Sequence, residues 1–252
     1  MMARRTEFTG IVVAIAITCW IAPAHGVNLL TNGSFEIWSG GYTPTTQPDR
    51  IFNDLTLSVP GWNFAIGLSS DIYRDKNATG AQSSYYDAAH GDYLAGSGSF
   101  QTTHEGISQT FTVAPNTTYQ LSFEMAPGGL NYSGSWIENA TLGSSWLVEL
   151  TGALPSAVSN TFNTNLAHFN ATGTTNPLAW TPQTLSFTSN AVGGSVLLKF
   201  TAFGDLTHVF LDNVVVERMV VPEPGVAGLL LAGTVGLGVV RRLHRGGGRG
   251  IA

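Results

Sequence analysis

The segment DKNATG, from Asp75 to Gly80, places oxygen-bearing side chains at the spacing with which an EF-hand loop begins. Such a loop binds Ca²⁺ through carboxylate and carbonyl oxygens and ends on a bidentate glutamate at its twelfth position. Here that position is Tyr86, and no helical pattern flanks the segment. We therefore predict a turn-rich, solvated loop rather than an EF-hand.

Aromatic and polar side chains gather in two polar stretches, QSSYYDAAH and NYSGSWIEN. Binding sites for small polar ligands combine apolar ring faces with a few placed polar groups, a combination that suits sugars. We predict a glycan-binding edge made of Tyr85, Tyr86, Asp87, Asp92, Asn131 and Trp136. Trp62 and Trp146 lie in apolar, strand-like runs and are predicted to belong to the core.

Catalytic motifs are missing from the chain. There is no Gly-x-Ser-x-Gly elbow, no His-Glu-x-x-His pair and no phosphate-binding loop. The histidines are isolated in sequence, and no spacing singles out two carboxylates as the acid and base of a glycosidase. We predict a protein that is not an enzyme, and a carbohydrate-active enzyme stays open as an alternative.

Period-two alternation of apolar and polar residues dominates the chain between Val27 and Met219, and no segment there has a convincing helical period. Alternation of this kind predicts half-buried strands. With Gly, Asn and Pro between the strands, it favours a β-sandwich. The strand-like segments are GISQTFTVAP, TYQLSFEMAP, SSWLVELTG, TPQTLSFTSN, GSVLLKFTAFG and VFLDNVVVER.

Two details of strand arrangement can be predicted as well. GISQTFTVAP and TYQLSFEMAP are separated only by an Asn-Thr-Thr turn, so we expect neighbouring antiparallel strands. In VFLDNVVVER we expect unbroken alternation, with Phe210, Asp212, Val214 and Val216 on one face.

The order of phrases along the chain resembles a known group. NLLTNGSFE opens the domain, VPGWNF, SSDIYR, HGDYLAGSGS, GISQTF, TYQLSF and WTPQTLSF follow, and FLDNVVVE closes it. This order is similar to that of the choice-of-anchor and DUF642-like group of galactose-binding-like jelly rolls, which are related to several carbohydrate-binding modules. The resemblance implies an all-β jelly-roll sandwich and is weak for any particular ligand.

The same resemblance implies a structural calcium ion that ties the first strand to the last. On this reading Glu36 of NGSFE and Asp212 of FLDNV are the side-chain ligands, and a backbone carbonyl of Asn32 or Ser34 helps to complete the shell. The alternative is that Glu36 pairs with a nearby base and Asp212 caps the end of a strand.

The N-terminus has the order of a secretory signal peptide. Arg4 and Arg5 precede the apolar run Ile11–Ala22, and Ala22-Pro23-Ala24 is a small-residue cleavage pattern. We predict a signal helix within residues 1–26, with cleavage after Ala24 or Gly26.

The C-terminus combines Pro222, Glu223 and Pro224 with the uncharged run Gly225–Val240 and a cluster that includes Arg241 and Arg242. Sixteen helical residues rise about 24 Å, slightly short of a hydrocarbon core of about 30 Å. Because Arg241 and Arg242 can snorkel to the interface, a span is just feasible. The arrangement resembles the PEP-CTERM sorting signal of Gram-negative bacteria. It implies a transmembrane helix over 225–240, processing by an exosortase, and delivery to the cell envelope or extracellular matrix. A plain membrane anchor is the alternative.

Composition is consistent with an exported β-sandwich domain over residues 27–219, followed by a sorting region over 220–252. The single cysteine, Cys19, lies in the signal region, so the domain has no disulfides. Five basic and fourteen acidic side chains between Val27 and Met219 give a formal charge of −9, which disfavours nucleic acid as a partner. We predict a non-enzymatic envelope or matrix protein that binds extracellular polysaccharide, or, alternatively, a purely structural surface protein.

Overall fold

The computed structural model describes residues 26–39, 50–51, 58–66, 70–75, 77–78, 87–100, 103–128, 144–164, 180–204 and 208–219. The predicted signal helix, sorting motif and transmembrane helix lie outside these residues. None of the described segments forms a helix long and apolar enough to cross a membrane.

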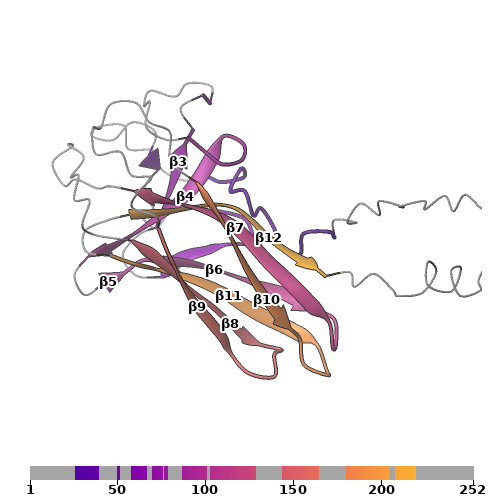
Figure 1. Ribbon diagram of the computed structural model, residues 1–252. Coiled ribbons are helices and arrows are strands. Elements are labelled where there is room, and N and C mark those ends of the chain that lie inside the picture. Colours follow the sequence, from indigo (N-terminus) through magenta and orange to yellow (C-terminus); the bar gives the residue numbers. More distant parts are fainter. Residues whose placement is uncertain are drawn as a thin grey trace, which may run out of the picture.

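The described chain is an all-β sandwich of two antiparallel sheets, as the alternation predicted (Figure 1). The seven-stranded sheet has the order β1-β3-β4-β12-β7-β10, with β5 paired to β4, and the five-stranded sheet has the order β2-β6-β11-β8-β9. The strands of the larger sheet are β1 (Arg50–Ile51), β3 (Asp71–Arg74), β4 (Tyr93–Phe100), β5 (Thr103–His104), β7 (Thr118–Gly128), β10 (Thr181–Thr188) and β12 (His208–Arg218). Those of the smaller sheet are β2 (Asn63–Ile66), β6 (Gly106–Val113), β8 (Ser145–Gly152), β9 (Val158–Asn163) and β11 (Gly194–Phe203).

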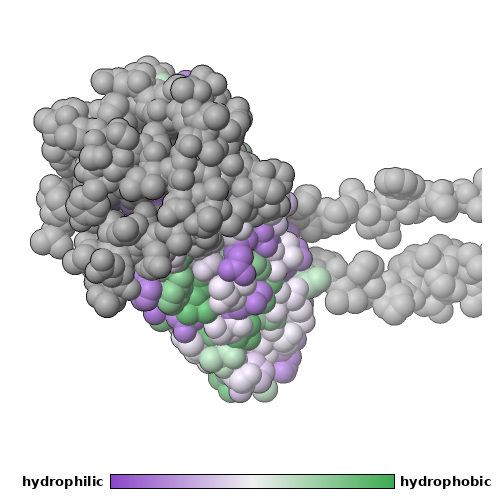
Figure 2. Space-filling view, turned by 60° about the vertical axis from the view of Figure 1, so that its left-hand side comes forward, coloured by the Kyte–Doolittle hydropathy of each residue, from purple (hydrophilic) through white to green (hydrophobic). Residues whose placement is uncertain are grey.

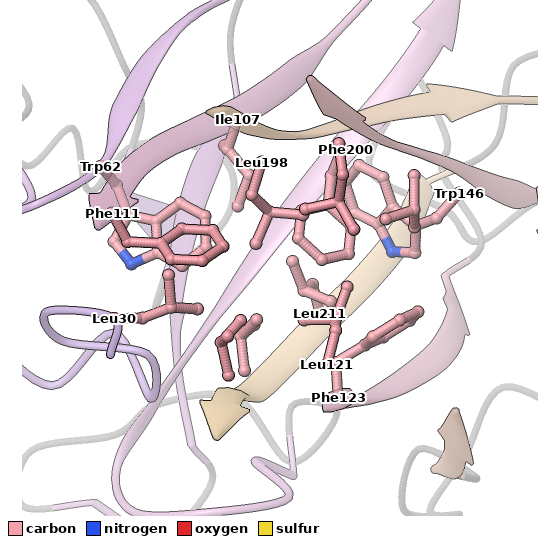
Figure 3. Packing of buried hydrophobic residues seen from close by; sticks show 14 of the residues in the cluster. Leu30, Trp62, Ile107, Phe111, Leu121, Phe123, Trp146, Leu198, Phe200 and Leu211 are labelled. Atoms are coloured by element: carbon pink, nitrogen blue, oxygen red, sulfur yellow. The ribbon is translucent and has the colours of Figure 1, made fainter. Parts of the chain in front are cut away.

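The core fills the space between the two sheets. Trp146, Val148, Leu198 and Phe200 from the smaller sheet and Leu121 from the larger are each 0% exposed. Figure 3 shows Leu121, Leu198 and Phe200 packed together in this core, with the rings of Trp62 and Trp146 at opposite ends of the cluster. The prediction that Trp62 and Trp146 are core residues is confirmed, at 8% and 0% exposure.

The expected pairing of β6 with β7 is wrong. β6 pairs with β2 and β11, whereas β7 pairs with β12 and β10, so the short turn between them passes from one sheet to the other. Asn116 occupies this turn with φ at +46°, and its N–H donates to Asn190 O at 2.9 Å. Each strand keeps its apolar face toward the core, and the alternation alone could not tell two facing strands from two paired ones.

The expected unbroken alternation in β12 is also wrong. The register against β7 shifts between Asp212 and Val215, and Asn213 has φ at +49°. This bulge puts Leu211 and Val214 into the main core. Phe210 and Asp212, which alternate with Leu211, therefore belong to the opposite face.

The first described segment lies against the last strand. Leu29 N donates to Val216 O at 2.8 Å, and Asn28 Oδ1 accepts from Val216 N at 2.9 Å (Figure 1). Gly26 N donates to a carboxylate oxygen of Glu217 at 3.1 Å. Residues at the two ends of the domain are therefore held together by hydrogen bonds.

Candidate functional site: two carboxylates around a turn

Asp212 is a buried carboxylate at the bulge of β12. Its side chain is 0% exposed, and it accepts hydrogen bonds from His90 N at 2.8 Å and Asn213 N at 2.6 Å. Burial, and then the negative charge of Glu36, raise the pKa of Asp212 to about 8 against the opposing effect of the N–H donors. The group is therefore held where ionisation is costly.

Glu36 approaches the same turn from the N-terminal segment. Its Oε1 accepts from Asp92 N and from Tyr93 N, each at 3.0 Å. The turn passes so close that a Cβ added at Gly91 would lie 2.3 Å from Oε1 of Glu36, and Gly91 has φ at +77°. The positive φ favours glycine at this position, and a side chain there would displace the Glu36 carboxylate.

The backbone before Glu36 has two residues with positive φ, and side-chain hydrogen bonds and packing hold it in place. Asn32 has φ at +54° and Phe35 at +59°, a value that a bulky residue adopts rarely. The Asn32 amide group donates to Ile37 O at 2.7 Å and accepts from Ile37 N at 3.1 Å. Phe35 is 0% exposed and lies 5.2 Å from the Trp62 ring, centroid to centroid. Packing of Phe35 thus fixes the direction of its neighbour Glu36.

The carbonyl of Asn32, one of the two implied by the resemblance, is already engaged. It accepts from Phe35 N at 3.1 Å and from Trp62 Nε1 at 2.9 Å. A carbonyl oxygen has two lone pairs, so these bonds leave none for a cation. The carbonyl of Ser34 remains the predicted backbone ligand.

Glu36 and Asp212 bring two carboxylates, which are hard oxygen donors, to one turn. Each offers about four acceptor positions, of which the turn uses only some. Among the described residues no group of three or more His, Cys, Asp or Glu side chains could hold a metal ion. Any ion bound by Glu36 and Asp212 would therefore need carbonyl or water oxygens as well, which is how Ca²⁺ is held. The Glu36 carboxylate accepts hydrogen bonds from backbone N–H groups of the turn. The predicted alternative had expected it to pair with a basic side chain instead.

The structure describes two of the predicted glycan-binding residues, and both border this turn. Asp92 is exposed, and its carbonyl accepts from Asp75 N at 2.7 Å. Asp87 is half-buried, and its carbonyl accepts from Trp180 Nε1 at 2.6 Å. Tyr85, Tyr86, Asn131 and Trp136 lie outside the described residues.

Asp75 contradicts the prediction of a solvated loop. Its side chain is 4% exposed, and its carboxylate accepts from Asn77 N at 2.5 Å and from Ala88 N at 2.6 Å. The aspartate at the start of DKNATG therefore joins residues on both sides of the intervening loop. Sequence reasoning missed this role because the second partner is the backbone N–H of Ala88, thirteen residues further on, and a backbone group leaves no mark in residue type.

Glu124 is a further acidic residue that the sequence did not single out. It stands opposite Asp212 in the pairing of β7 with β12, and burial raises its pKa. The only signal was its position in TYQLSFEM, where it alternates with Phe123 and Met125, which face the core.

Comparisons with known proteins show no family. No family model and no curated protein matches the chain. Among solved structures, a CBM61 module in complex with β-1,4-galactotriose is 13% identical, with a TM-score of 0.42 over 76% of this chain and 99% of that one. A CBM4 module is 12% identical, with a TM-score of 0.36 over 75% and 99% of the two chains.

A third solved structure is the CBM22-1 xylan-binding domain of Paenibacillus barcinonensis Xyn10C. It is 11% identical, with a TM-score of 0.39 over 78% of this chain and 97% of that one. These neighbours are jelly-roll domains of carbohydrate-binding modules. The present chain is an all-β jelly-roll sandwich, and its resemblance to the choice-of-anchor and PEP-CTERM groups rests on its own residues.

Proposed function

We propose that the protein is a non-enzymatic, exported surface or matrix protein whose jelly-roll domain binds glycans and is held closed by Ca²⁺. The calcium proposal rests on one observation. The carboxylates of Glu36 and Asp212, which come from the first and last parts of the domain, both accept hydrogen bonds from backbone N–H groups of one turn. Asp212 is buried with a raised pKa, so a cation beside it would offset an otherwise costly charge.

Ca²⁺ supplies stability here rather than chemistry. Glu36 and Asp212 are the proposed side-chain ligands, and the Ser34 carbonyl is a proposed backbone ligand. Because the two carboxylates come from the first and last parts of the domain, an ion that binds both stabilises only the folded state. This matters in an exported domain without disulfides.

Calcium-dependent unfolding of the full chain tests this part. At a free Ca²⁺ concentration of a hundred times Kd, binding to the folded state adds about 2.7 kcal/mol. We expect a higher unfolding midpoint in Ca²⁺ than in chelator, and loss of this difference in Glu36→Ala. Asp92→Ala, which removes an exposed carboxylate beside the same turn, is the control. An equal midpoint with and without Ca²⁺ would reject the metal.

Asp87 and Asp92, the two described residues of the proposed glycan-binding edge, flank the same turn. The other residues proposed to bind the glycan are Tyr85, Tyr86, Asn131 and Trp136. The absence of catalytic motifs in the sequence supports binding without turnover. Affinity electrophoresis in gels containing β-1,4-galactan, xylan or the anionic polysaccharide alginate tests it.

We expect retardation by a neutral polysaccharide and a weaker effect in Trp136→Ala. Chromatography of the same polysaccharides after overnight incubation tests for cleavage. Release of oligosaccharides would contradict the non-enzymatic part, and no retardation in any gel would leave the purely structural role.

Export and sorting form a separate part of the proposal. The N-terminal signal sends the chain across the inner membrane, and the Pro222-Glu223-Pro224 motif with the Arg241-Arg242 cluster directs processing by an exosortase-type enzyme. The C-terminal helix is then a transient membrane anchor. Fractionation of a Gram-negative host that has an exosortase should place the protein in the envelope or medium, shortened at its C-terminus. Glu223→Ala should leave the full-length chain in the inner membrane.

A further inference from the structure

Three loops meet at one end of the sandwich and form a continuous surface, which we name the loop pole. They are residues 114–117 between β6 and β7, 153–157 between β8 and β9, and 189–193 between β10 and β11. Backbone hydrogen bonds join all three. Asn116 N donates to Asn190 O at 2.9 Å, and Asn190 N donates to Ala153 O at 3.0 Å. The loops are therefore held in one place relative to one another.

The first and last segments of the described domain reach the same pole. Met219 N donates to Thr118 O at 2.9 Å, and Thr118 directly follows the first of the three loops. Gly26 N donates to a carboxylate oxygen of Glu217, so the first segment lies beside the end of β12. Figure 1 shows the end of β12 on the same side of the sandwich as the loops that lead into β7 and β11. The predicted signal and sorting regions therefore both adjoin the loop pole.

Exposed apolar side chains concentrate at this pole. Val27, Val192 and Met219 are 85%, 83% and 42% exposed, and they are three of the five exposed large apolar residues in the described part of the chain. Asn190 Oδ1 accepts from Val192 N at 3.0 Å and from Gly193 N at 2.9 Å, which fixes the turn that presents Val192. Figure 2 shows green residues among pale and purple ones at the lower tip of the described surface, where Figure 1 has the loops. Clustered apolar exposure of this kind is typical of an interaction surface.

The three loops carry neither charges nor aromatic rings. Their sequences are APNT, ALPSA and SNAVG. The domain between Val27 and Met219 has five basic and fourteen acidic side chains, so an uncharged surface lets it approach an anionic lipid layer with least repulsion. Glu217 and Arg218, at the end of β12, are opposite in sign. Without ring faces the pole does not suit a sugar, and a lipid surface fits it better.

The chain beyond the pole limits its distance from a membrane. Five residues, 220–224, separate Met219 from the predicted transmembrane helix over 225–240. Five residues span at most about 18 Å when fully extended. The headgroup layer occupies about 5 to 8 Å on each side of the hydrocarbon core. While the helix is in the bilayer, Met219 is therefore held within about 10 to 13 Å of the outer limit of the headgroups.

We propose that the loop pole is a lipid-contacting surface on which the domain rests while the C-terminal helix anchors it. The Val192 side chain enters the interface, and the uncharged loops lie against the headgroups. This contact holds the Pro222-Glu223-Pro224 motif at the membrane surface until the chain is processed. The inference rests on the proposed export and sorting, and it adds a contact that anchoring alone does not require.

Site-directed fluorescence of the full chain in proteoliposomes tests the contact. The single cysteine is removed by Cys19→Ser, and a bimane label is attached at Val192→Cys. The vesicles contain phosphatidylethanolamine, phosphatidylglycerol and a lipid whose headgroup carries a nitroxide quencher. We expect about fivefold stronger quenching at Val192→Cys than at Asn163→Cys, because Asn163 is exposed at the end of β9 remote from the 153–157 loop.

A second variant separates contact from mere tethering. With the label at Ala157→Cys, on the neighbouring loop, Val192→Asp should reduce quenching about threefold, because an anionic lipid surface repels the added charge. Ile37→Asp is the matched control, since it makes the same kind of change in a residue that is 61% exposed next to Glu36. Quenching that Val192→Asp leaves unchanged would show a tethered domain without lipid contact and would overturn the proposal.

The remaining outcomes distinguish this contact from the sorting proposal. If alkaline carbonate extracts the full chain from the vesicles, the helix does not anchor it, and sorting and contact fail together. If the chain stays anchored but the label at Val192→Cys is not quenched, the contact alone is wrong. If unlabelled Val192→Cys chains form disulfide-linked dimers and the labelled ones are not quenched, the pole meets a second copy rather than lipid.

Discussion

At the scale of single residues, the pair formed by Glu36 and Asp212 shows what sequence and structure each contribute. Resemblance singled out both residues although they are far apart in the chain. It could not show that both carboxylates grip backbone N–H groups of one turn, or that the Asn32 carbonyl is already engaged. Those facts depend on where the fold places backbone groups, and the residue types at Glu36, Asp212 and Asn32 do not reveal that placement.

Asp212→Asn should separate two effects of the buried carboxylate: the free-energy cost of its charge and its proposed binding of Ca²⁺. The amide removes the charge that burial and Glu36 disfavour, but it keeps only one oxygen acceptor, whereas the His90 and Asn213 N–H groups donate to different oxygens of Asp212. In chelator we expect an unfolding free energy within about 2 kcal/mol of that of the wild type, because removal of the buried charge offsets the loss of one hydrogen bond. In Ca²⁺ we expect the variant to gain nothing, as measured by urea unfolding monitored by tryptophan fluorescence. A loss of several kcal/mol in chelator would show that the ionised carboxylate is itself stabilising.

The pH dependence of stability without metal should follow Asp212. Its pKa is about 8 in the folded domain and near 3.8 when unfolded, so the folded state binds the proton more tightly. This contribution is fully present below the unfolded pKa and is lost as pH rises through the folded pKa. In chelator we expect the unfolding free energy to fall by a few kcal/mol between pH 5 and pH 9.

Ca²⁺ should flatten this profile, because a bound cation favours the charged carboxylate and lowers the pKa. Asp212→Asn should show a flat profile without metal as well. Urea unfolding at a series of pH values gives the curve, and a wild-type stability that rises from pH 5 to pH 9 in chelator would contradict the assignment.

At the scale of elements, strand existence was predictable and strand partnership was not. The segments GISQTFTV and TYQLSFEM are both strands, as alternation predicted, but they belong to different sheets. Alternation records which face is buried, and in a sandwich that information is the same for two facing strands and for two paired ones. The bulge at Asn213 escaped notice for a related reason, since an asparagine with positive φ looks like any other strand asparagine in sequence.

The contact between the first segment and the last strand should depend strongly on Asn28. Its Oδ1 accepts from Leu30 N and Val216 N, and its Nδ2 donates to Val214 O. Asn28→Ala removes three partly buried hydrogen bonds, so we expect a loss of about 2 to 3 kcal/mol in unfolding free energy. Asn160→Ala, an exposed asparagine on β9, should change stability by less than about 0.5 kcal/mol. Equal effects of the two substitutions would show that the Asn28 hydrogen bonds between the first segment and β12 contribute little to the unfolding free energy.

At the scale of the whole molecule, an apolar layer joins two sheets whose order the sequence did not reveal. On β11, the buried residues Val196, Leu198, Phe200 and Ala202 follow the period-two alternation of GSVLLKFTAFG. The smaller cluster of Tyr73, Leu94, Ala126 and Phe210 was not predicted, because it forms only where the bulge in β12 places Phe210 on the outer face. One indole joins the sheets directly: Trp146 Nε1 on β8 donates to Phe210 O on β12 at 3.2 Å.

Trp146→Phe should therefore test how tightly the two sheets are coupled. The substitution removes the bond to Phe210 O and leaves part of a fully buried volume empty beside Phe200, whose ring centroid lies 5.7 Å from that of Trp146. We expect a loss of about 2 to 4 kcal/mol, from one buried hydrogen bond and a small cavity. Trp38→Phe makes the same chemical change in a half-buried residue in contact with Tyr93, and should cost less.

The slope of unfolding free energy against urea carries the rest of this test. If the sandwich unfolds as one cooperative unit, Trp146→Phe lowers the midpoint and leaves the slope unchanged, because the same surface becomes exposed. A shallower slope, or transitions that differ between tryptophan fluorescence and circular dichroism, would show that the sheets separate before they unfold. In that case the indole bond would hold two nearly independent layers together, and Ca²⁺ at the Glu36–Asp212 turn would stabilise only the seven-stranded sheet that contains β12 and β4.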